Sequence, residues 1–356
     1  MIRRLRAEPD RFELRIAVTA QHRDMLDQVL ELFSIAPDYD LNLMQPGQTL
    51  TSLTARILTA LEPVLERESP DVAVVQGDTT TTMAGALAAF YRRVPVAHVE
   101  AGLRTGDLAQ PFPEELNRAI TGRIAALHFA PTPRAAAALA AEGVACERIF
   151  VTGNTGIDAV LHVRDALQAG AIPVPEWPWL DTRRHLVLVT SHRRENFGPG
   201  FERVMNALMR LAARPDVQIV YPVHRNPNVA EPAFRLLAGL SNVVLVDPLP
   251  YASFIDLMRR SRLIVSDSGG IQEEAPSLGK PVLVLREKTE RPEAVEAGTV
   301  RLVGTNEDLI VAETARLLEN EAEYSRMSRT HNPYGDGQAS GRIARLLAGF
   351  PGAPSR

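Results

Sequence analysis

The chain has 356 residues, of which 45% are hydrophobic and 23% charged, a composition that is typical of globular protein and sufficient for two domains with separate cores. Its formal net charge of -4 gives no general attraction to nucleic acid or to an anionic membrane, so we expect neither as a partner. The single cysteine, Cys146, excludes a disulfide framework and a thiolate metal site within one chain, and no apolar run is long enough for a membrane span or a signal region. These features predict a cytoplasmic protein.

Short apolar runs recur along the chain, and a helical pattern follows each of them. Because their Val, Ile and Leu residues do not alternate with polar ones, these runs predict strands buried on both faces, as in a parallel sheet covered by helices. The predicted fold class is therefore α/β. The runs lie at residues 14–18, 71–75, 94–99, 148–153, 185–191, 218–223, 243–247, 262–268, 281–285 and 300–304.

A proline-rich segment at residues 169–182 separates two series of these runs. Its prolines, Pro173, Pro175 and Pro178, interrupt both a helix and a strand ladder, as expected of a linker. We therefore place the boundary between an N-terminal domain, residues 1–172, and a C-terminal domain, residues 173–340, near Pro173.

Polar clusters follow the ends of the predicted strands rather than their starts. Ligands of doubly wound sheets bind in the crevice outside the carboxyl ends of the strands, so repeated clusters there indicate a site. Both halves of the chain contribute, which favours two Rossmann-like domains that face each other with the ligand between them. The clusters are Gln21-His22, Gln76-Gly77-Asp78, His98 with Glu100, Gly153-Asn154, Ser191-His192-Arg193-Arg194, His224-Arg225-Asn226 and Asp267-Ser268-Gly269-Gly270.

Residues 263–285 predict a strand, a short Ser-Gly-Gly turn, a helix and a second strand. The N–H groups and the dipole at the start of this helix would attract phosphate oxygens, and Gly269 and Gly270 would let the backbone approach them. Glu273 and Glu274 follow about one turn later, where a carboxylate can accept hydrogen bonds from ribose hydroxyls. The alternative is a capped helix with a favourable acidic first turn. The spacing matches neither the Walker pattern nor the dinucleotide fingerprint, so it supports neither an ATPase nor a dehydrogenase.

An unusual concentration of charge lies at residues 98–122. It comprises Glu100, Glu114, Glu115, Arg104 and Arg118. A structural explanation exists, because Pro113 suits the first position of a helix whose first turn would hold Glu114 and Glu115.

That explanation does not account for Asp78, Glu100 and His192, which are all expected at the same crevice. A partly desolvated carboxylate has a raised pKa and can donate a proton, whereas one beside an arginine stays ionised. The sequence has no nucleophile elbow, metal cluster or nicotinamide fingerprint. Proton transfer on a nucleotide-linked substrate is therefore the reaction class that the residues support best.

The sequences of these motifs and their order along the chain closely resemble those of the bacterial non-hydrolysing UDP-N-acetylglucosamine 2-epimerases. The resemblance runs from about residue 14 to residue 345, and the most distinctive segments are QGDTTTT, HVEAGLRTGD, PFPEELNRAITG, TGNTGIDA, TSHRRENFG, YPVHRNPNV, SDSGGIQEEAPSLGKPVLVL and NPYGDG. It implies a glycosyltransferase-B-like fold, a homodimer, and a C-terminal helix within residues 341–356 that packs back on the N-terminal domain.

The resemblance also implies an activity, the interconversion of UDP-N-acetylglucosamine and UDP-N-acetylmannosamine for surface polysaccharide synthesis. Loss of the C2 proton and of UDP would give 2-acetamidoglucal, and re-addition of UDP with protonation from the other face would invert C2. This needs neither a redox cofactor nor a metal, but at least two proton-transfer groups. The implied catalytic residues are Asp78, Glu100, Glu114 and His192, and the implied UDP contacts are Arg118, His224, Phe254, Ser268, Gly269, Gly270 and Glu274.

The remaining residues to consider are an aromatic residue, a cysteine and two histidines. Phe254 could either stack near the uracil or pack in the core, and the sequence does not decide between these roles. Cys146, His128 and His162 fall in no strand-end cluster, and we expect them to be structural.

Members of the family carry a second, activating nucleotide-sugar site, and a set of polar residues here matches its description. That set is Gln21, His22, Gln45, Gln48 and Arg193. The resemblance therefore implies a candidate allosteric site.

The start of the chain departs from the family. Members begin with an apolar strand and a Gly-Thr-Arg-Pro-Glu loop, whereas residues 1–12 here read as a helix, so we expect the first domain to lack its first strand. One explanation is a natural chain that extends upstream. Another is a truncated nucleotide-binding relative without catalysis. A hydrolysing epimerase that releases N-acetylmannosamine and UDP, and a glycosyltransferase of the same fold, are further alternatives.

Overall fold

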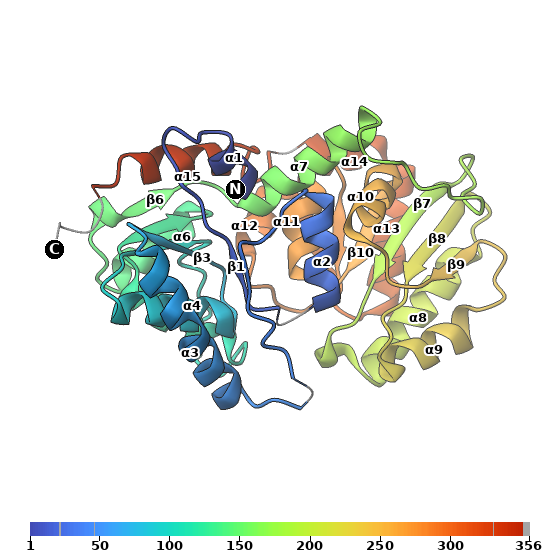
Figure 1. Ribbon diagram of the computed structural model, residues 1–356. Coiled ribbons are helices and arrows are strands. Elements are labelled where there is room, and N and C mark those ends of the chain that lie inside the picture. Colours follow the sequence, from blue (N-terminus) through green and yellow to red (C-terminus); the bar gives the residue numbers. More distant parts are fainter. Residues whose placement is uncertain (21–22, 46, 330, 352–356) are drawn as a thin grey trace. The chain divides into compact units, whose positions relative to one another are not determined.

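The computed structural model describes residues 1–20, 23–45, 47–329 and 331–351, and it divides into two compact units (Figure 1). Unit 1 comprises Met1–Asp158 and Gly335–Arg356, and unit 2 comprises Ala159–Tyr334. The division falls within helix α7 (Thr155–Gln168), which precedes the proline-rich segment. Both units consist of parallel strands and helices, which confirms the α/β fold class.

The described residues of unit 1 form six strands in two sheets. The first sheet has the order β1-β2 and the second the order β3-β4-β5-β6, with every pair parallel. The strands are β1 (Ala17–Val18), β2 (Tyr39–Asp40), β3 (Ala73–Gln76), β4 (Val96–Val99), β5 (Leu127–Ala130) and β6 (Ile149–Val151). The helices, besides α7, are α1 (Ile2–Arg6), α2 (Arg23–Leu32), α3 (Leu50–Glu68), α4 (Thr80–Tyr91), α5 (Glu114–Ile124), α6 (Pro133–Ala141) and α15 (Ala339–Ala348).

In unit 2, the described residues form one parallel sheet of order β12-β11-β10-β7-β8-β9. Its strands are β7 (His185–Thr190), β8 (Val217–Pro222), β9 (Val243–Val246), β10 (Leu263–Ser266), β11 (Val282–Val284) and β12 (Val300–Leu302). Its helices are α8 (Pro199–Ala212), α9 (Pro227–Leu237), α10 (Tyr251–Arg260), α11 (Gly269–Ser277), α12 (Pro292–Ala297), α13 (Glu307–Glu319) and α14 (Glu321–Arg329).

Each apolar run of the sequence contains or overlaps a strand, but β2 and β5 were not predicted. Strand β5 carries His128 between its apolar residues, and that side chain is completely buried. Within the described residues β1 pairs only with β2 and β3 only with β4, so the unit 1 strands do not form one sheet. The expected absence of a first strand stays a prediction.

The chain termini of unit 1 share one hydrophobic core. Leu5 of α1 packs with Ile343 and Leu347 of α15 against residues of β4 and β5. Phe129 of β5 is fully buried in this cluster. The C-terminal helix therefore completes the core of the unit that holds the N-terminus.

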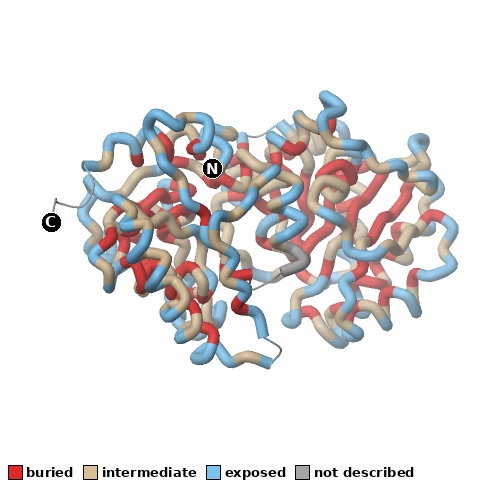
Figure 2. The backbone as a smooth tube through the Cα atoms, in the orientation of Figure 1, coloured by how far each residue is buried: buried red, intermediate tan, exposed pale blue. Residues whose placement is uncertain are grey.

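The core of unit 2 lies between its sheet and helix α8. Burial is continuous along the central strands, as Figure 2 shows, because apolar residues of β7, β8 and β10 face helices on both sides. Leu208 of α8 and Ile219 of β8 are fully buried there. No helix among the described residues has the length and apolar content needed to cross a membrane.

Polar caps fix the helices that follow the strand ends. The side chains of Thr79, Thr132 and Asn226 accept hydrogen bonds from the first turns of α4, α6 and α9. Each such cap stabilises its helix by about 1 kcal/mol. The caps therefore fix the residue at which each helix begins after its strand.

Two buried histidines make the stability of unit 1 depend on pH. Burial lowers the pKa of His98 to about 4, and burial likewise lowers that of His128 to about 4. In the unfolded chain both take up protons near pH 6.5, so native stability falls as the pH drops from 7 to 5, by about 2 kcal/mol for each residue. Denaturant unfolding of His98→Gln should show a smaller loss between these pH values than the parent protein. An equal loss in the two proteins would contradict this assignment.

Gly102 is required by a close backbone approach in the turn after β4. Its φ is +90°, and an added Cβ would lie 2.2 Å from the carbonyl oxygen of Ala135. Gly102→Ala should therefore lower the free energy of unfolding by about 3 kcal/mol or more. Gly143 has a similar φ of +85° but nothing within 4 Å, so Gly143→Ala should cost only about 1 kcal/mol. Chemical denaturation of the two variants measures this difference, and equal losses would contradict the steric argument.

Candidate active site

The turn after β3 places Asp78 at the carboxyl end of the four-stranded sheet. Gly77 has a φ of +75°, which L residues rarely adopt, and its carbonyl oxygen lies 2.8 Å from Nε2 of His98 on the neighbouring strand β4. The amide nitrogen Nδ2 of Asn117 donates to the Asp78 carbonyl at 2.9 Å. The backbone on both sides of the Asp78 side chain is thereby fixed.

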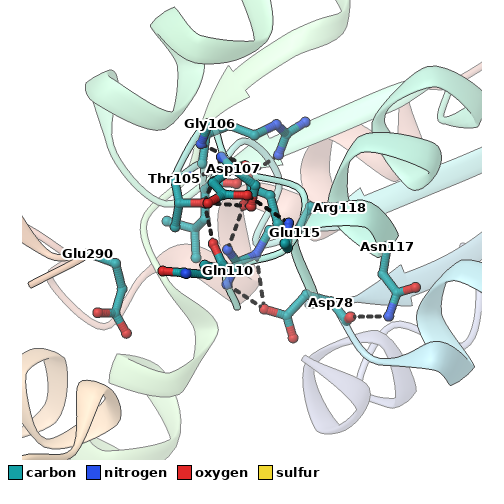
Figure 3. Close-up of polar contacts among 12 residues, drawn as sticks. Asp78, Thr105, Gly106, Asp107, Gln110, Glu115, Asn117, Arg118 and Glu290 are labelled. Carbon is teal, nitrogen blue, oxygen red and sulfur yellow. Dashed lines mark hydrogen bonds and ion pairs between the residues drawn. The ribbon is translucent and has the colours of Figure 1, made fainter. Parts of the chain in front are cut away.

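A buried guanidinium holds two carboxylates at this turn (Figure 3). Arg118 of α5 donates from Nη2 to Oδ2 of Asp78 at 2.7 Å, and from Nε to the same oxygen at 3.0 Å. Its Nη1 donates to Oε2 of Glu115 at 3.0 Å. The Arg118 and Glu115 side chains are 9% and 2% exposed, whereas Asp78 is 29% exposed. Asp78 is thus oriented by protein groups and still accessible to a ligand.

Glu115 has a positioning role that the sequence did not reveal. Its second oxygen, Oε1, accepts hydrogen bonds from the N–H groups of Thr105 at 3.0 Å and Gly106 at 3.1 Å. Figure 3 shows these bonds tying the loop after β4 to helix α5. The paired glutamates at the start of this helix therefore differ, since Glu115 is buried and Glu114 is half-buried.

Glu100 lies beside the turn that carries Asp78. A Cβ added to Gly77 would meet Oε2 of Glu100 at 3.8 Å. Glu100 itself has a φ of +65°, a conformation that costs about 1 kcal/mol for a residue other than glycine. Glu114 follows Pro113 in the first turn of α5, as expected, with Pro113 at the capping position. Unit 1 therefore brings Asp78, Glu100 and Arg118 together.

In unit 2, two histidines follow neighbouring strands. His192 comes after β7 and His224 after β8, and their rings stack with centroids 5.5 Å apart. Nδ1 of His224 accepts from the backbone N–H of Asn226 at 3.1 Å. The His192 side chain is 40% exposed and its Nδ1 lies 3.6 Å from Oδ1 of buried Asp267.

The start of α11 has the features of an anion site. The side chain of Ser268 makes no capping hydrogen bond, and the first N–H groups of a helix have no partner within that helix. An added Cβ at Gly270 would meet nothing within 4 Å, so the protein itself does not require glycine there. A ligand that approaches the backbone would require it.

Arg291 is a further candidate site residue, which the sequence did not indicate. An added Cβ at Gly269 would lie 2.5 Å from its Nη1, so the guanidinium lies against the start of α11. Glu273 and Glu290 hold it there, at 2.5 Å and 2.7 Å. No motif marks this arginine, because its partners lie about twenty residues away in the sequence or directly beside it.

Glu274 is distinguished from its neighbour Glu273 by its surroundings. Burial raises the pKa of Glu274 to about 8, with a smaller contribution from the charge of Glu273. Its Oε1 accepts a hydrogen bond from the Tyr251 hydroxyl at 3.4 Å. Phe254 lies in the first turn of the same helix as Tyr251 and is half-buried, so the ring is not a fully buried core residue.

The candidate allosteric residues are not assembled by described contacts. Gln21 and His22 lie outside the described residues. Oε1 of Gln48 accepts from the N–H of Gln45 at 3.2 Å, within the loop before α3. This allosteric site therefore stays a prediction, as does the absence of a metal, although the described residues contain no group of three His, Cys, Asp or Glu that could hold one.

Comparison with known proteins places this arrangement in a family. The sequence model of the UDP-N-acetylglucosamine 2-epimerase family matches residues 3–348. A relative from Escherichia coli O157:H7, named UDP-N-acetylglucosamine 2-epimerase, is 60% identical over 341 residues, which cover 94% of this chain and 91% of that protein. A protein of the same name from Salmonella typhimurium is 59% identical over 95% of this chain and 92% of its own length.

Solved structures agree with the sequence comparison. The UDP-GlcNAc 2-epimerase of Neisseria meningitidis, crystallised with UDP-GlcNAc, matches with a TM-score of 0.90 and 46% identity over 98% of this chain and 95% of that chain. The Methanocaldococcus jannaschii enzyme, in complex with UDP-GlcNAc and UDP, matches with a TM-score of 0.78 and 34% identity over 97% of this chain and 94% of that chain. The protein therefore belongs to the UDP-N-acetylglucosamine 2-epimerase family.

Proposed function

We propose that this protein is a non-hydrolysing epimerase that interconverts UDP-N-acetylglucosamine and UDP-N-acetylmannosamine. The observation that carries the proposal is the 60% identity to a UDP-N-acetylglucosamine 2-epimerase over 94% of the chain. The arrangement of carboxylates, arginines and helix N-terminus described above supports it. No redox cofactor or metal has a step to perform in this reaction.

Unit 2 supplies groups suited to the UDP part of the substrate. The N–H groups at Ser268, Gly269 and Gly270, with Arg291 beside them, suit the diphosphate because both favour negative charge. Glu274 suits the ribose, since its carboxyl group lies one turn into the same helix. Phe254 suits stacking with the uracil and His224 suits the diphosphate.

The chemistry is an elimination followed by an addition. A base takes the C2 proton, the C1–O bond breaks with its electron pair on the UDP oxygen, and a C1=C2 double bond forms in 2-acetamidoglucal. UDP then adds back to C1 while a proton is delivered to the opposite face of C2. Because C2–H is weakly acidic, cleavage of the C1–O bond is well advanced in the transition state, and negative charge grows on the departing diphosphate. Cationic groups and N–H donors at the diphosphate therefore lower the barrier.

Two faces of C2 must be served, so at least two groups transfer protons. Asp78, Glu100, Glu114 and His192 are the proposed set. The contacts of Arg118 support a role in orienting Asp78, with the implied UDP contact of Arg118 as a further prediction. Homodimer formation, a cytoplasmic location and allosteric activation by a second nucleotide sugar also stay predictions.

The identity of the products tests the proposed function. Incubation with UDP-N-acetylglucosamine, followed by anion-exchange chromatography, should give UDP-N-acetylmannosamine at a constant total of UDP-sugars. Free N-acetylmannosamine with stoichiometric UDP would indicate a hydrolysing epimerase instead. Binding of UDP without any turnover would indicate a nucleotide-binding relative, and either result would overturn the proposal.

Gly270→Ala tests the diphosphate site without disturbing the fold. The added Cβ meets no protein atom within 4 Å, so the free energy of unfolding should stay within about 0.5 kcal/mol of the parent value. The same methyl group would obstruct a phosphate at the helix start, so the Kd for UDP should rise about tenfold or more. Isothermal titration calorimetry measures the affinity, with Gly341→Ala, also in open space, as the matched control. Unchanged UDP affinity in Gly270→Ala would place the diphosphate elsewhere.

A further inference from the structure

The two oxygens of the Asp267 carboxylate differ in their hydrogen bonds. It follows β10 and is completely buried, and its Oδ2 accepts hydrogen bonds from Ser191 Oγ at 2.8 Å and from the N–H groups of His192 and Arg193, each at 2.9 Å. Asn196 Nδ2 adds a longer contact at 3.3 Å. Oδ2 alone therefore accepts these hydrogen bonds from the turn after β7.

The other oxygen, Oδ1, is buried and has no hydrogen-bond partner among the described residues. An unsatisfied buried carboxylate oxygen is costly, by about 1 to 3 kcal/mol, so a structural role alone does not explain it. Nδ1 of the His192 ring lies 3.6 Å away, and a small rotation of the ring would bring the two atoms within hydrogen-bond distance.

His192 is held so that such a rotation is feasible. Its backbone N–H is fixed by Oδ2 of the same carboxylate, and its ring stacks on His224 at an interplanar angle of 18°. The side chain is 40% exposed, so the ring remains partly accessible although it contacts both Asp267 and His224. The arrangement joins a buried carboxylate to an accessible imidazole.

We propose that Asp267 is a positioning residue that acts through His192. It accepts a hydrogen bond from Nδ1–H, fixes that tautomer, and leaves Nε2 as the nitrogen that exchanges a proton with the substrate. When His192 takes up a proton, Asp267 stabilises the imidazolium. This rests on the proposed function only in assigning a substrate to His192.

The groups around His192 have opposite effects on the pKa of its ring. Burial lowers the pKa of His192, Asp267 raises it, and the charges of Arg193 and His224 lower it. Removal of the Asp267 charge should therefore move the titration of His192 to lower pH. A purely structural role of Asp267 would leave the pH dependence of catalysis unchanged.

The variant Asp267→Asn tests the inference. Its amide oxygen can keep the bonds at the Oδ2 position, whereas its NH2 group at the Oδ1 position would favour the opposite tautomer of His192. We expect kcat to fall about 100-fold with KM within threefold, and the His192 limb of the pH profile to shift to lower pH. The double variant Asp267→Asn with His192→Gln should be no slower than His192→Gln alone.

Ser191→Ala is the matched control, because it removes a bond to Oδ2 and leaves Oδ1 unchanged. It should lower thermal stability but keep the pH profile. An unchanged pH profile in Asp267→Asn, or losses that multiply in the double variant, would overturn the proposal.

A readout independent of turnover is the tautomer of His192 in the wild-type protein. Nitrogen-15 NMR, with the His192 signal assigned by its loss in His192→Gln, should show the Nδ1–H form. The Nε2–H form would overturn the inference even if Asp267→Asn fails to fold. If the wild type does not turn over UDP-N-acetylglucosamine, the proposed function fails, and the tautomer still decides whether Asp267 pairs with His192.

Discussion

The buried ion group of Arg118 is the interaction on which the architecture of unit 1 depends. One guanidinium joins the turn after β3, through Asp78, to the first turn of α5, through Glu115, and Glu115 in turn holds the loop after β4. Loss of the guanidinium of Arg118 would leave the buried carboxylate of Glu115 without its cation, at a cost of about 3 to 5 kcal/mol. The group explains two members of the charged stretch at residues 98–122, because Arg118 and Glu115 together hold the more accessible Asp78 in place.

In unit 2, backbone N–H groups rather than a guanidinium hold the buried carboxylate. Parallel strands end at one edge of a sheet, so β7, β8 and β10 bring His192, His224 and Asp267 together although they are far apart in the chain. A carboxylate that accepts main-chain N–H groups stabilises the turn, and its second oxygen remains for function. In both units, a buried charge pays its desolvation cost with several bonds and sets the orientation of a less buried group.

The sequence predicted what depends on local pattern. Unbroken apolar runs marked most strands, and Pro113 and the Ser-Gly-Gly turn marked the starts of α5 and α11. Strand β5 was missed because buried His128 interrupts its pattern, and two-residue β2 is too short to show a period. Composition and spacing alone favoured proton transfer on a nucleotide-linked substrate, and only the resemblance to a family supplied the sugar.

The roles that depend on three-dimensional contacts were not predictable. Local sequence pattern could not separate Glu114 from Glu115, because the contacts of Glu115 with Arg118 and with the loop after β4 form only in the folded unit. It had no signal for Arg291 or for the unequal oxygens of Asp267, since both follow from atoms brought together by the sheet. Such positioning groups are visible only once the partners that they hold are known.

The fate of the C2 proton tests the central claim most directly. Proton NMR of UDP-N-acetylglucosamine with this protein in deuterated water follows that proton as the product forms. Elimination and re-addition through proton transfer predict UDP-N-acetylmannosamine with deuterium at C2, and deuterium entering the recovered substrate as the reaction reverses. UDP-N-acetylmannosamine that keeps its original C2 proton would contradict the account, because the carboxylates and the histidine would then have no proton to transfer.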